Sequence, residues 1–460
     1  MQLFFPKGEI IRLFITISMI EIPTSLLNEL EGSEGFDRED FIAAHQQEVP
    51  VSIRLNPFKN CEMDLLLANK IDWCENSFYL NERPSFTHDA LFHAGAYYVQ
   101  EAGSMFLEWA LKTIKDLPAD PIAMDLCGSP GGKSTILSSF LSNKGLLISN
   151  EVIKTRTATL VQNLNKWGAD NSLVINNDPK DLEVLSGEID LLIIDAPCSG
   201  SGLFRKQPDA IQEWSEENVS FCASRQKRIL SDSISLLKDG GYLFYSTCSY
   251  SFEENESNVE WMIKELDFEL KEIEVRPEWG IVKTELGYRF YPHRTKSEGF
   301  FCALLRKKES GNVKRTRKQN KKQNNFVKNS PYQCYFPEKQ GEIVKFGEFF
   351  HFLPQQFEKL SFVWGSNLYL KKAGVCLGEM KGNDIIPNHE LALSFNAVHN
   401  QKINLNKEDA LIYLRKQELK VQSPLRGFSL LEYKGLGIGW GKVLDRRFNN
   451  YLPSELRILS

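Results

Sequence analysis

Apolar strand segments alternate with helical patterns between residues 121 and 308, and this alternation limits most strongly how the chain can fold. Residues 189–194 are almost continuously apolar, as expected for a strand that is covered on both faces. Helical patterns separate the strands, for example over residues 155–167 and 216–237. We therefore expect an α/β domain with a mostly parallel sheet and helices on both faces. The expected strands are 122–126, 146–150, 172–176, 190–195, 242–246 and 300–306.

Length and composition limit the number of domains and the class of protein. A chain of 460 residues has room for two to four domains. Its net charge of −5 does not mark it as a nucleic-acid binder, so local charge must carry such an argument. Nine cysteines without a C-x-x-C pair favour reduced thiols in a cytoplasmic protein over a disulfide framework or a zinc site. We therefore expect no metal.

Composition changes along the chain predict the domain boundaries. Residues 19–115 read as a small α/β domain, 116–308 as the main domain, and 331–460 as a β-rich region with closely spaced glycines near its end. Residues 309–330 read as a basic linker, since ten Lys or Arg and one acid lie between Arg306 and Lys328. This linker either only solvates the chain or also contacts phosphates.

The apolar N-terminal stretch leaves two interpretations open. Residues 10–20 resemble a short signal peptide, but Arg12 interrupts the stretch and no small-residue cleavage site follows. The stretch is also too short to span a membrane. The alternative is that Met19 is the true start and that residues 1–18 are an extension of the gene model.

A glycine-rich turn between an expected strand and an expected helix predicts a nucleotide-like ligand. It is one residue short of a Walker loop, because Cys127 stands where that loop requires glycine. Glu151, Asp178 and Asp195 end or follow successive strands, where they would repel a triphosphate but suit a ribose, an adenine and a cationic sulfonium. S-adenosylmethionine is therefore favoured over ATP, unless these acids only cap helices. The candidate cofactor loop contains Cys127, Gly128, Ser129, Pro130, Gly131, Gly132 and Lys133.

Two cysteines, Cys198 and Cys248, follow neighbouring strands of the expected sheet. A thiolate that adds to carbon 6 of a cytosine makes carbon 5 nucleophilic enough to accept a methyl group. An acid must then hydrogen-bond the N3/N4 edge of the base, and Asp195 is placed to do so. The residue pattern does not rank the two thiols. The other seven cysteines read as small buried apolar residues.

Together these motifs resemble the NOL/NOP/Sun family of RNA cytosine-C5 methyltransferases over roughly residues 50–306. The sequence Asp125 to Lys133 is similar to the family's D-x-C-A-A-P-G-G-K loop. Residues 195–202 and 246–249 are similar to its two cysteine motifs. Residues 291–294 and 298–301 are similar to a further signature, in which Ser297 replaces the usual glycine. The resemblance implies a Rossmann-like S-adenosylmethionine methyltransferase domain.

The resemblance also implies individual roles. Cys248 would be the nucleophile, and Cys198 would assist product release. Glu151 would hold the ribose hydroxyls and Asp178 the adenine. Asp195 would lie between the methyl donor and the base, and Lys133 would lie in the same cleft.

The C-terminal part resembles the end of bacterial RsmF/YebU-type enzymes, which act on small-subunit ribosomal RNA. Residues 435–442, with Asn450-Tyr451-Leu452-Pro453, carry this similarity. It implies a PUA-like RNA-binding module in 331–460 and an RNA-binding N-terminal domain. We expect the protein to be a monomer. We expect it to bind RNA and not to associate with a membrane. Methylation of transfer RNA and a non-catalytic ribosome assembly factor remain alternatives. A DNA methyltransferase is disfavoured, because those enzymes carry the nucleophile in the Pro-Cys motif.

Overall fold

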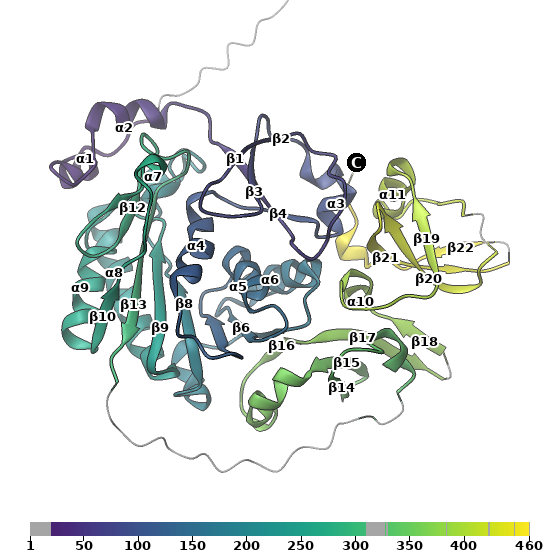
Figure 1. The fold of residues 1–460 in the computed structure, drawn as a ribbon. Helices are drawn as coiled ribbons and strands as arrows, with labels where there is room; N and C mark the ends of the chain where they lie inside the picture. The colour runs from purple at the N-terminus through teal and green to yellow at the C-terminus, as the bar shows by residue number, and fades with distance from the viewer. Residues whose placement is uncertain are drawn as a thin grey trace, which may run out of the picture.

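The computed structural model describes residues 20–309, 327, 330–382, 384–421, 424–445 and 447–459 (Figure 1). The expected N-terminal extension, 1–18, lies outside the described residues, and so does most of the expected basic linker, 309–330.

A ten-stranded mixed sheet forms the centre of the molecule, in the order β11-β12-β13-β9-β8-β5-β6-β7-β16, with β10 beside β13. From β7 to β9 neighbouring strands are parallel, and β13 is antiparallel to β9. The six strands expected from the sequence are present, which confirms the α/β class. The bounds are β5 (Ile122–Asp125), β6 (Leu146–Asn150), β7 (Ser172–Ile175), β8 (Ile189–Asp195), β9 (Leu237–Thr247), β10 (Phe268–Lys271), β11 (Val282–Lys283), β12 (Tyr288–Phe290), β13 (Phe300–Lys307) and β16 (Leu370–Ala373).

Helices cover both faces of this sheet. Within β8, Leu191 and Ile193 pack against a core formed with α4, α5 and α6. Leu192 and Ile194 pack against a second core formed with α8 and α9. The strand is apolar throughout because its alternate side chains enter two different cores. No helix of the described residues is long and apolar enough to cross a membrane. The helices are α4 (Phe106–Thr113), α5 (Gly132–Leu141), α6 (Lys154–Trp167), α7 (Ala210–Glu213), α8 (Glu216–Ser233) and α9 (Glu256–Glu265).

The N-terminal domain contributes an antiparallel sheet, β2-β3-β1-β4, and three helices. Helices α1 and α2 pack against loops of the central domain rather than against the sheet, because Leu26, Leu30 and Phe41 share a core with Tyr250 and Tyr291. The elements are α1 (Thr24–Leu30), α2 (Arg38–His45), β1 (Val51–Leu55), β2 (Leu67–Lys70), β3 (Ser77–Leu80), α3 (Ala90–His93) and β4 (Tyr97–Val99).

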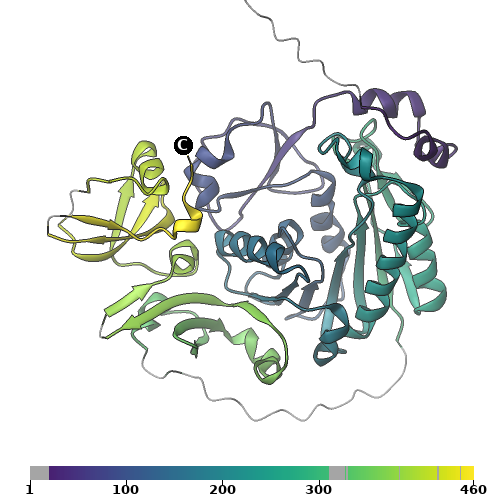
Figure 2. The ribbon, with the colours of Figure 1, turned by 180° about the vertical axis from the view of Figure 1, so that it is seen from behind.

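The C-terminal region contains two four-stranded sheets, and it lies against the N-terminal domain and the β7 side of the central sheet (Figure 2). Its strand β16 extends the central sheet by pairing antiparallel with β7. The expected glycine-rich hairpin is present as β20 and β21. A Cβ atom at Gly437 would lie 2.1 Å from the Ala392 carbonyl oxygen, so close backbone approach explains the glycine. The elements are β14 (Gly341–Phe346), β15 (Phe349–Pro354), β17 (Val375–Lys381), β18 (Asp384–Pro387), α10 (His389–Leu393), β19 (Lys402–Leu405), α11 (Lys407–Leu414), β20 (Gly427–Tyr433), β21 (Leu436–Val443) and β22 (Phe448–Asn450).

All three parts of the chain meet at the carboxyl end of α6. Lys59 of the N-terminal domain donates from Nζ to the Lys166 carbonyl oxygen over 2.7 Å, which satisfies a helix-end acceptor. Burial lowers the pKa of Lys59 to about 7. The Phe395 amide of the C-terminal region donates to the Gly168 carbonyl oxygen. Its ring stacks on Phe58 with centroids 4.7 Å apart.

Candidate functional site

The two candidate cysteines lie together at the carboxyl end of the central sheet. β8 and β9 pair in parallel with Asp195 opposite Ser246, so the loops after both strands start side by side. The Sγ atoms of Cys198 and Cys248 are 2.8 Å apart. Their hydrogen bond, together with burial, raises the pKa of Cys198 well above its ordinary value. The protonation of the two thiols is therefore linked, and either sulfur can donate to the other.

Asp195 and Lys133 form an ion pair at the same strand ends. Lys133 Nζ lies 2.8 Å from Asp195 Oδ2, and Ser246 Oγ donates to Asp195 Oδ1 over 2.7 Å. Lys133 Nζ also lies 5.1 Å from the centroid of the Phe300 ring. The Asp195 side chain is 39% exposed, whereas that of Lys133 is 10% exposed. The carboxylate is thus fixed in direction but open to a ligand.

Glu254 holds the two cysteine loops together and was missed by the sequence analysis. Its fully buried carboxylate accepts hydrogen bonds from the Ser199 amide at 2.8 Å and the Ser199 hydroxyl at 2.5 Å. It also accepts from the Ser249 hydroxyl at 2.5 Å and from Gln226 Nε2 at 3.0 Å. Each serine directly follows a candidate cysteine, so one carboxylate sets the positions of both. The acidic cluster at residues 253–256, close behind the second cysteine, was the available signal.

Gly202 lets the two loops approach each other closely. Its amide donates to the Cys248 carbonyl oxygen over 2.8 Å, and its carbonyl oxygen accepts from the Gly299 amide over 3.0 Å. A Cβ atom at Gly202 would lie 2.4 Å from the Gly299 oxygen and 2.7 Å from the Cys248 oxygen. Any larger residue would push the Cys248 loop away.

Ser297, which departs from the family motif, is accommodated beside a buried ion pair. Arg205 Nη2 lies 2.6 Å from Glu298 Oε1 and donates to the Ser297 carbonyl oxygen over 2.7 Å. The Ser297 hydroxyl hydrogen-bonds the Thr295 hydroxyl. The hydroxyl group that serine adds in place of glycine therefore has a hydrogen-bond partner.

The candidate cofactor loop is closely packed and carries a buried carboxyl group. The Gly128 amide donates to the Asn150 carbonyl oxygen over 2.8 Å, and a Cβ atom at Gly128 would lie 3.1 Å from Ser134 Oγ. Asp125 Oδ2 accepts from Ser134 Oγ over 2.6 Å, whereas Asp125 Oδ1 is buried without a partner. Burial raises the pKa of Asp125 to about 7. These features fit a nucleoside ligand that approaches the backbone closely and offers a hydrogen bond to Asp125.

The remaining loop residues hold the loop against α6. Ser129 Oγ donates to the Arg156 carbonyl oxygen over 3.0 Å, and Asn163 Nδ2 donates to the Pro130 carbonyl oxygen over 2.8 Å. Gly131 has a φ of +116° and precedes Gly132, where α5 begins. Cys127 packs against the apolar core, and burial raises the pKa of its thiol.

Glu151 and Asp178 stand after β6 and β7, next to this loop in the sheet order. Glu151 Oε1 accepts from the Ile153 amide over 2.9 Å, and its Oε2 lies 3.7 Å from Arg156 Nε. Asp178 Oδ1 accepts from the Lys180 amide over 3.3 Å. Asp178 thus caps the next helical segment. The bond of Glu151 goes to the amide of Ile153, which precedes α6, so Glu151 does not cap that helix. Both positions are compatible with ligand binding by the other carboxylate oxygen.

A groove of about 960 Å³ lies between the N-terminal domain and the central domain, and we call it the long groove. Its lining carries five Arg or Lys and four Glu. Glu298 in its wall precedes Gly299, which hydrogen-bonds Gly202 beside Cys248, so the groove passes close to the cysteine loops. The five cations are Arg83, Arg205, Lys206, Arg294 and Lys296.

Three sequence profiles match this chain. The profile of the N-terminal domain of 16S rRNA methyltransferase RsmF matches residues 22–102. The profile of 16S rRNA methyltransferase RsmB/F matches residues 113–306, and the profile of the methyltransferase RsmF PUA domain matches residues 400–458.

Relatives match over nearly the whole chain. Ribosomal RNA small subunit methyltransferase F of Shewanella woodyi is 30% identical over 451 residues, which cover 91% of this chain and 92% of the relative. The protein of the same name from Vibrio parahaemolyticus is 28% identical over 482 residues, which cover 95% and 98%.

Solved structures share the fold. A methyltransferase homologue from Pyrococcus horikoshii is 26% identical with a TM-score of 0.51, covering 62% of this chain and 100% of that one. NSun6 from the same organism, solved with SFG, is 21% identical with a TM-score of 0.52, covering 62% and 97%. The central domain therefore has the fold of an S-adenosylmethionine-dependent methyltransferase. With the matches along the whole sequence, the chain belongs to the ribosomal RNA small subunit methyltransferase F family.

Proposed function

We propose that this chain methylates carbon 5 of a cytosine in small-subunit ribosomal RNA, in the cytoplasm, with Cys248 as the nucleophile. The observation that carries the proposal is the contact between Cys198 and Cys248 beside the Asp195–Lys133 ion pair. Two adjacent thiols suit a reaction in which one thiol forms a bond to the substrate and the other removes a proton from it.

In the first half of the reaction, the Cys248 thiolate forms a bond to carbon 6 of the cytosine. The electrons of the C5–C6 double bond then make carbon 5 a nucleophile. S-adenosylmethionine, when bound at the loop 127–133, supplies the methyl group. Asp195 accepts a hydrogen bond from the exocyclic amine of the base, and Lys133 places a positive charge near the electron-rich ring.

In the second half, Cys198 first loses its own proton to solvent and then, as a thiolate, removes the proton from carbon 5. The C5–C6 double bond reforms and the bond between Cys248 and carbon 6 breaks. The pKa of Cys198 is raised first by its hydrogen bond with Cys248 and also by the proximity of that sulfur. Both contributions weaken when Cys248 becomes a neutral thioether. Cys198 thus becomes easier to deprotonate at the stage that needs a base.

The test is to incubate the purified chain with labelled S-adenosylmethionine and, in separate reactions, transfer RNA, naked small-subunit RNA or assembled small subunits. Digested products are analysed for 5-methylcytidine. Label in the small subunit or its RNA, lost in Cys248→Ala and kept in the matched control Cys334→Ala, is the expected result. Cys334 is exposed and lies outside the site.

Each other outcome overturns a defined part of the proposal. 5-Methylcytidine in transfer RNA alone would keep the chemistry and replace the substrate. Full activity of Cys248→Ala would remove the nucleophile assignment. No label in any RNA, with cofactor binding intact, would favour a non-catalytic assembly factor.

A further inference from the structure

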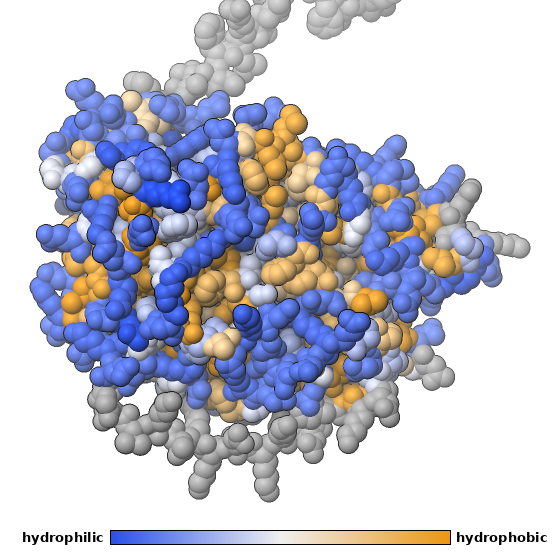
Figure 3. Space-filling view, in the orientation of Figure 1, coloured by the Kyte–Doolittle hydropathy of each residue, from blue (hydrophilic) through white to orange (hydrophobic). Residues whose placement is uncertain are grey.

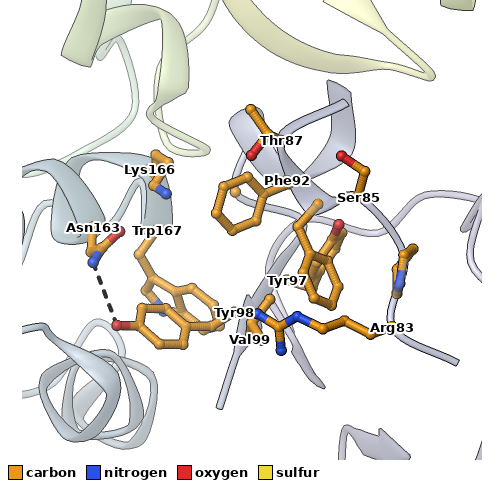
Figure 4. Close-up of a pocket in the computed structure, with 13 residues that line it drawn as sticks. Arg83, Ser85, Thr87, Phe92, Tyr97, Tyr98, Val99, Asn163, Lys166 and Trp167 are labelled. Atoms are coloured by element: carbon orange, nitrogen blue, oxygen red, sulfur yellow. Dashed lines mark hydrogen bonds between the residues drawn. The ribbon is translucent and has the colours of Figure 1, made fainter. Parts of the chain in front are cut away.

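A second cavity lies apart from the cysteines, between the N-terminal domain and α6, and we call it the interdomain pocket (Figure 4). It encloses about 460 Å³, which is a size typical of ligand pockets. In Figure 4 the Phe92 ring lies between Lys166 and Tyr97, and the Arg83 side chain reaches toward Tyr98. On the face drawn in Figure 3, apolar residues show among hydrophilic ones near the centre, where the N-terminal domain meets α6 in Figure 1.

The lining of this pocket combines aromatic rings with positive charge. Lys166 Nζ lies 4.1 Å from the centroid of the Phe92 ring, and the Arg83 guanidinium lies 5.6 Å from that of Phe86. Neither cation forms an ion pair with a carboxylate in the part of the chain that the structure describes, and the lining contains no acid. Burial lowers the pKa of Lys166 to about 8, and a bound anion would favour its charged form.

The pocket is connected both to the cofactor loop and to the long groove. Asn163 donates from Nδ2 to the Pro130 carbonyl oxygen of that loop and, over 3.4 Å, to the Tyr98 hydroxyl. Arg83 and Val99 line both the pocket and the long groove. A single-stranded nucleic acid that follows the long groove past the cysteine loops therefore reaches the interdomain pocket.

We propose that the interdomain pocket binds an unpaired nucleotide of the substrate RNA other than the cytosine that reacts. Its base would stack on Phe92 or Tyr98, and its phosphates would contact Arg83 and Lys166. Aromatic faces with adjacent cations are how proteins hold unpaired nucleotides. A pocket with two cations and no acid excludes cationic ligands and selects an anionic one. The inference rests on the proposed function, since it concerns the same RNA.

The test measures binding of in vitro transcribed small-subunit RNA to the full chain. Arg83→Ala removes an exposed cation and should weaken RNA binding about 5-fold. It should also lower the slope of log affinity against log salt concentration by about one. Arg83→Ala combined with Phe92→Leu should weaken binding at least 10-fold and raise KM with little change in kcat. The matched controls are Lys264→Ala and Phe221→Leu, which alter exposed residues on α9 and α8.

A second measurement does not depend on folding of the variants. The wild-type chain is photo-cross-linked to RNA that contains 4-thiouridine, and the modified peptides are mapped. Cross-links in residues 83–99 are expected. Unchanged affinity of Arg83→Ala together with no cross-link there would overturn the inference, even if 5-methylcytidine forms. Weakened binding without any 5-methylcytidine would instead keep the pocket and overturn the proposed function. Cross-links only outside these residues, with the pocket variants binding normally, would place the RNA elsewhere and likewise overturn the inference.

Discussion

The Sγ atom of Cys198 lies 2.8 Å from that of Cys248, so the protonation of either thiol depends on the other. Parallel pairing of β8 and β9 creates this contact, and Glu254 holds it from behind through the two following serines. A reaction that consumes one thiolate then changes the acidity of its neighbour.

Cys198→Ala is expected to stop the reaction after methyl transfer. Cys248 can still attack carbon 6, but the group proposed to remove the carbon-5 proton is gone. A covalent protein–RNA adduct should therefore accumulate in a denaturing gel when S-adenosylmethionine is present. The adduct should be absent in the Cys198→Ala/Cys248→Ala double variant. Normal turnover by Cys198→Ala, with trapping by Cys248→Ala, would reverse the two roles.

Glu254→Gln is expected to lower kcat at least 10-fold and to destabilise the fold by about 1–3 kcal/mol, because buried hydrogen bonds to a charged acceptor are weakened. RNA affinity should change little, which a KM measurement checks. The control is Glu253→Gln, since Glu253 is the exposed neighbour and accepts a hydrogen bond from Ser220 on the surface. Equal kcat in the two variants would refute a positioning role for Glu254.

Acidification should loosen the packing of α2 on the cysteine loops. His45 is buried between Phe41 and Tyr250, and burial lowers its pKa from 6.5 to about 4. Because the folded pKa is lowered, the stability that neutral His45 contributes is complete above about pH 6.5. It is lost as the pH falls toward 4, at a cost of up to about 3 kcal/mol.

Urea unfolding of the wild type and of His45→Gln between about pH 7 and pH 4.5 measures this effect. The free energy of unfolding should fall less steeply in the variant. His88→Gln, which alters a histidine outside this core, should keep the wild-type slope. Identical slopes in all three proteins would assign the acid sensitivity to other groups.

Lys372→Met should destabilise the joint between β16 and the C-terminal region. Lys372 is buried on β16, pairs with Glu390 of α10 and also donates to the Gly374 carbonyl oxygen. Removing it leaves a buried carboxylate without its cation, which costs about 3–5 kcal/mol. Thermal unfolding should show recovery in Lys372→Met/Glu390→Gln, whereas Lys371→Met, at the exposed neighbour, should unfold like the wild type. A double variant as unstable as Lys372→Met would show that the charge is not the cause.

The central sheet could be predicted from the sequence because its strands are apolar on both faces and its helices have their own periodicity. β16 could not, since it is only Leu370–Ala373 and pairs with a strand almost 200 residues earlier. Glu254 reads in sequence as one more acid near a helix start, and only the fold brings both serines to it. The helix cap formed by Asp178 was foreseen as an alternative. The interdomain pocket could not be predicted, because its lining comes from segments that share no sequence motif.

The meeting of three domains at the carboxyl end of α6 has a consequence for substrate choice. Lys59, Gly168 and Phe395 fix the N-terminal and C-terminal parts against the same helix that supports the cofactor loop. The fold therefore sets the distance between the C-terminal surface and Cys248. An RNA that contacts both the C-terminal surface and the site at Cys248 must therefore span that distance.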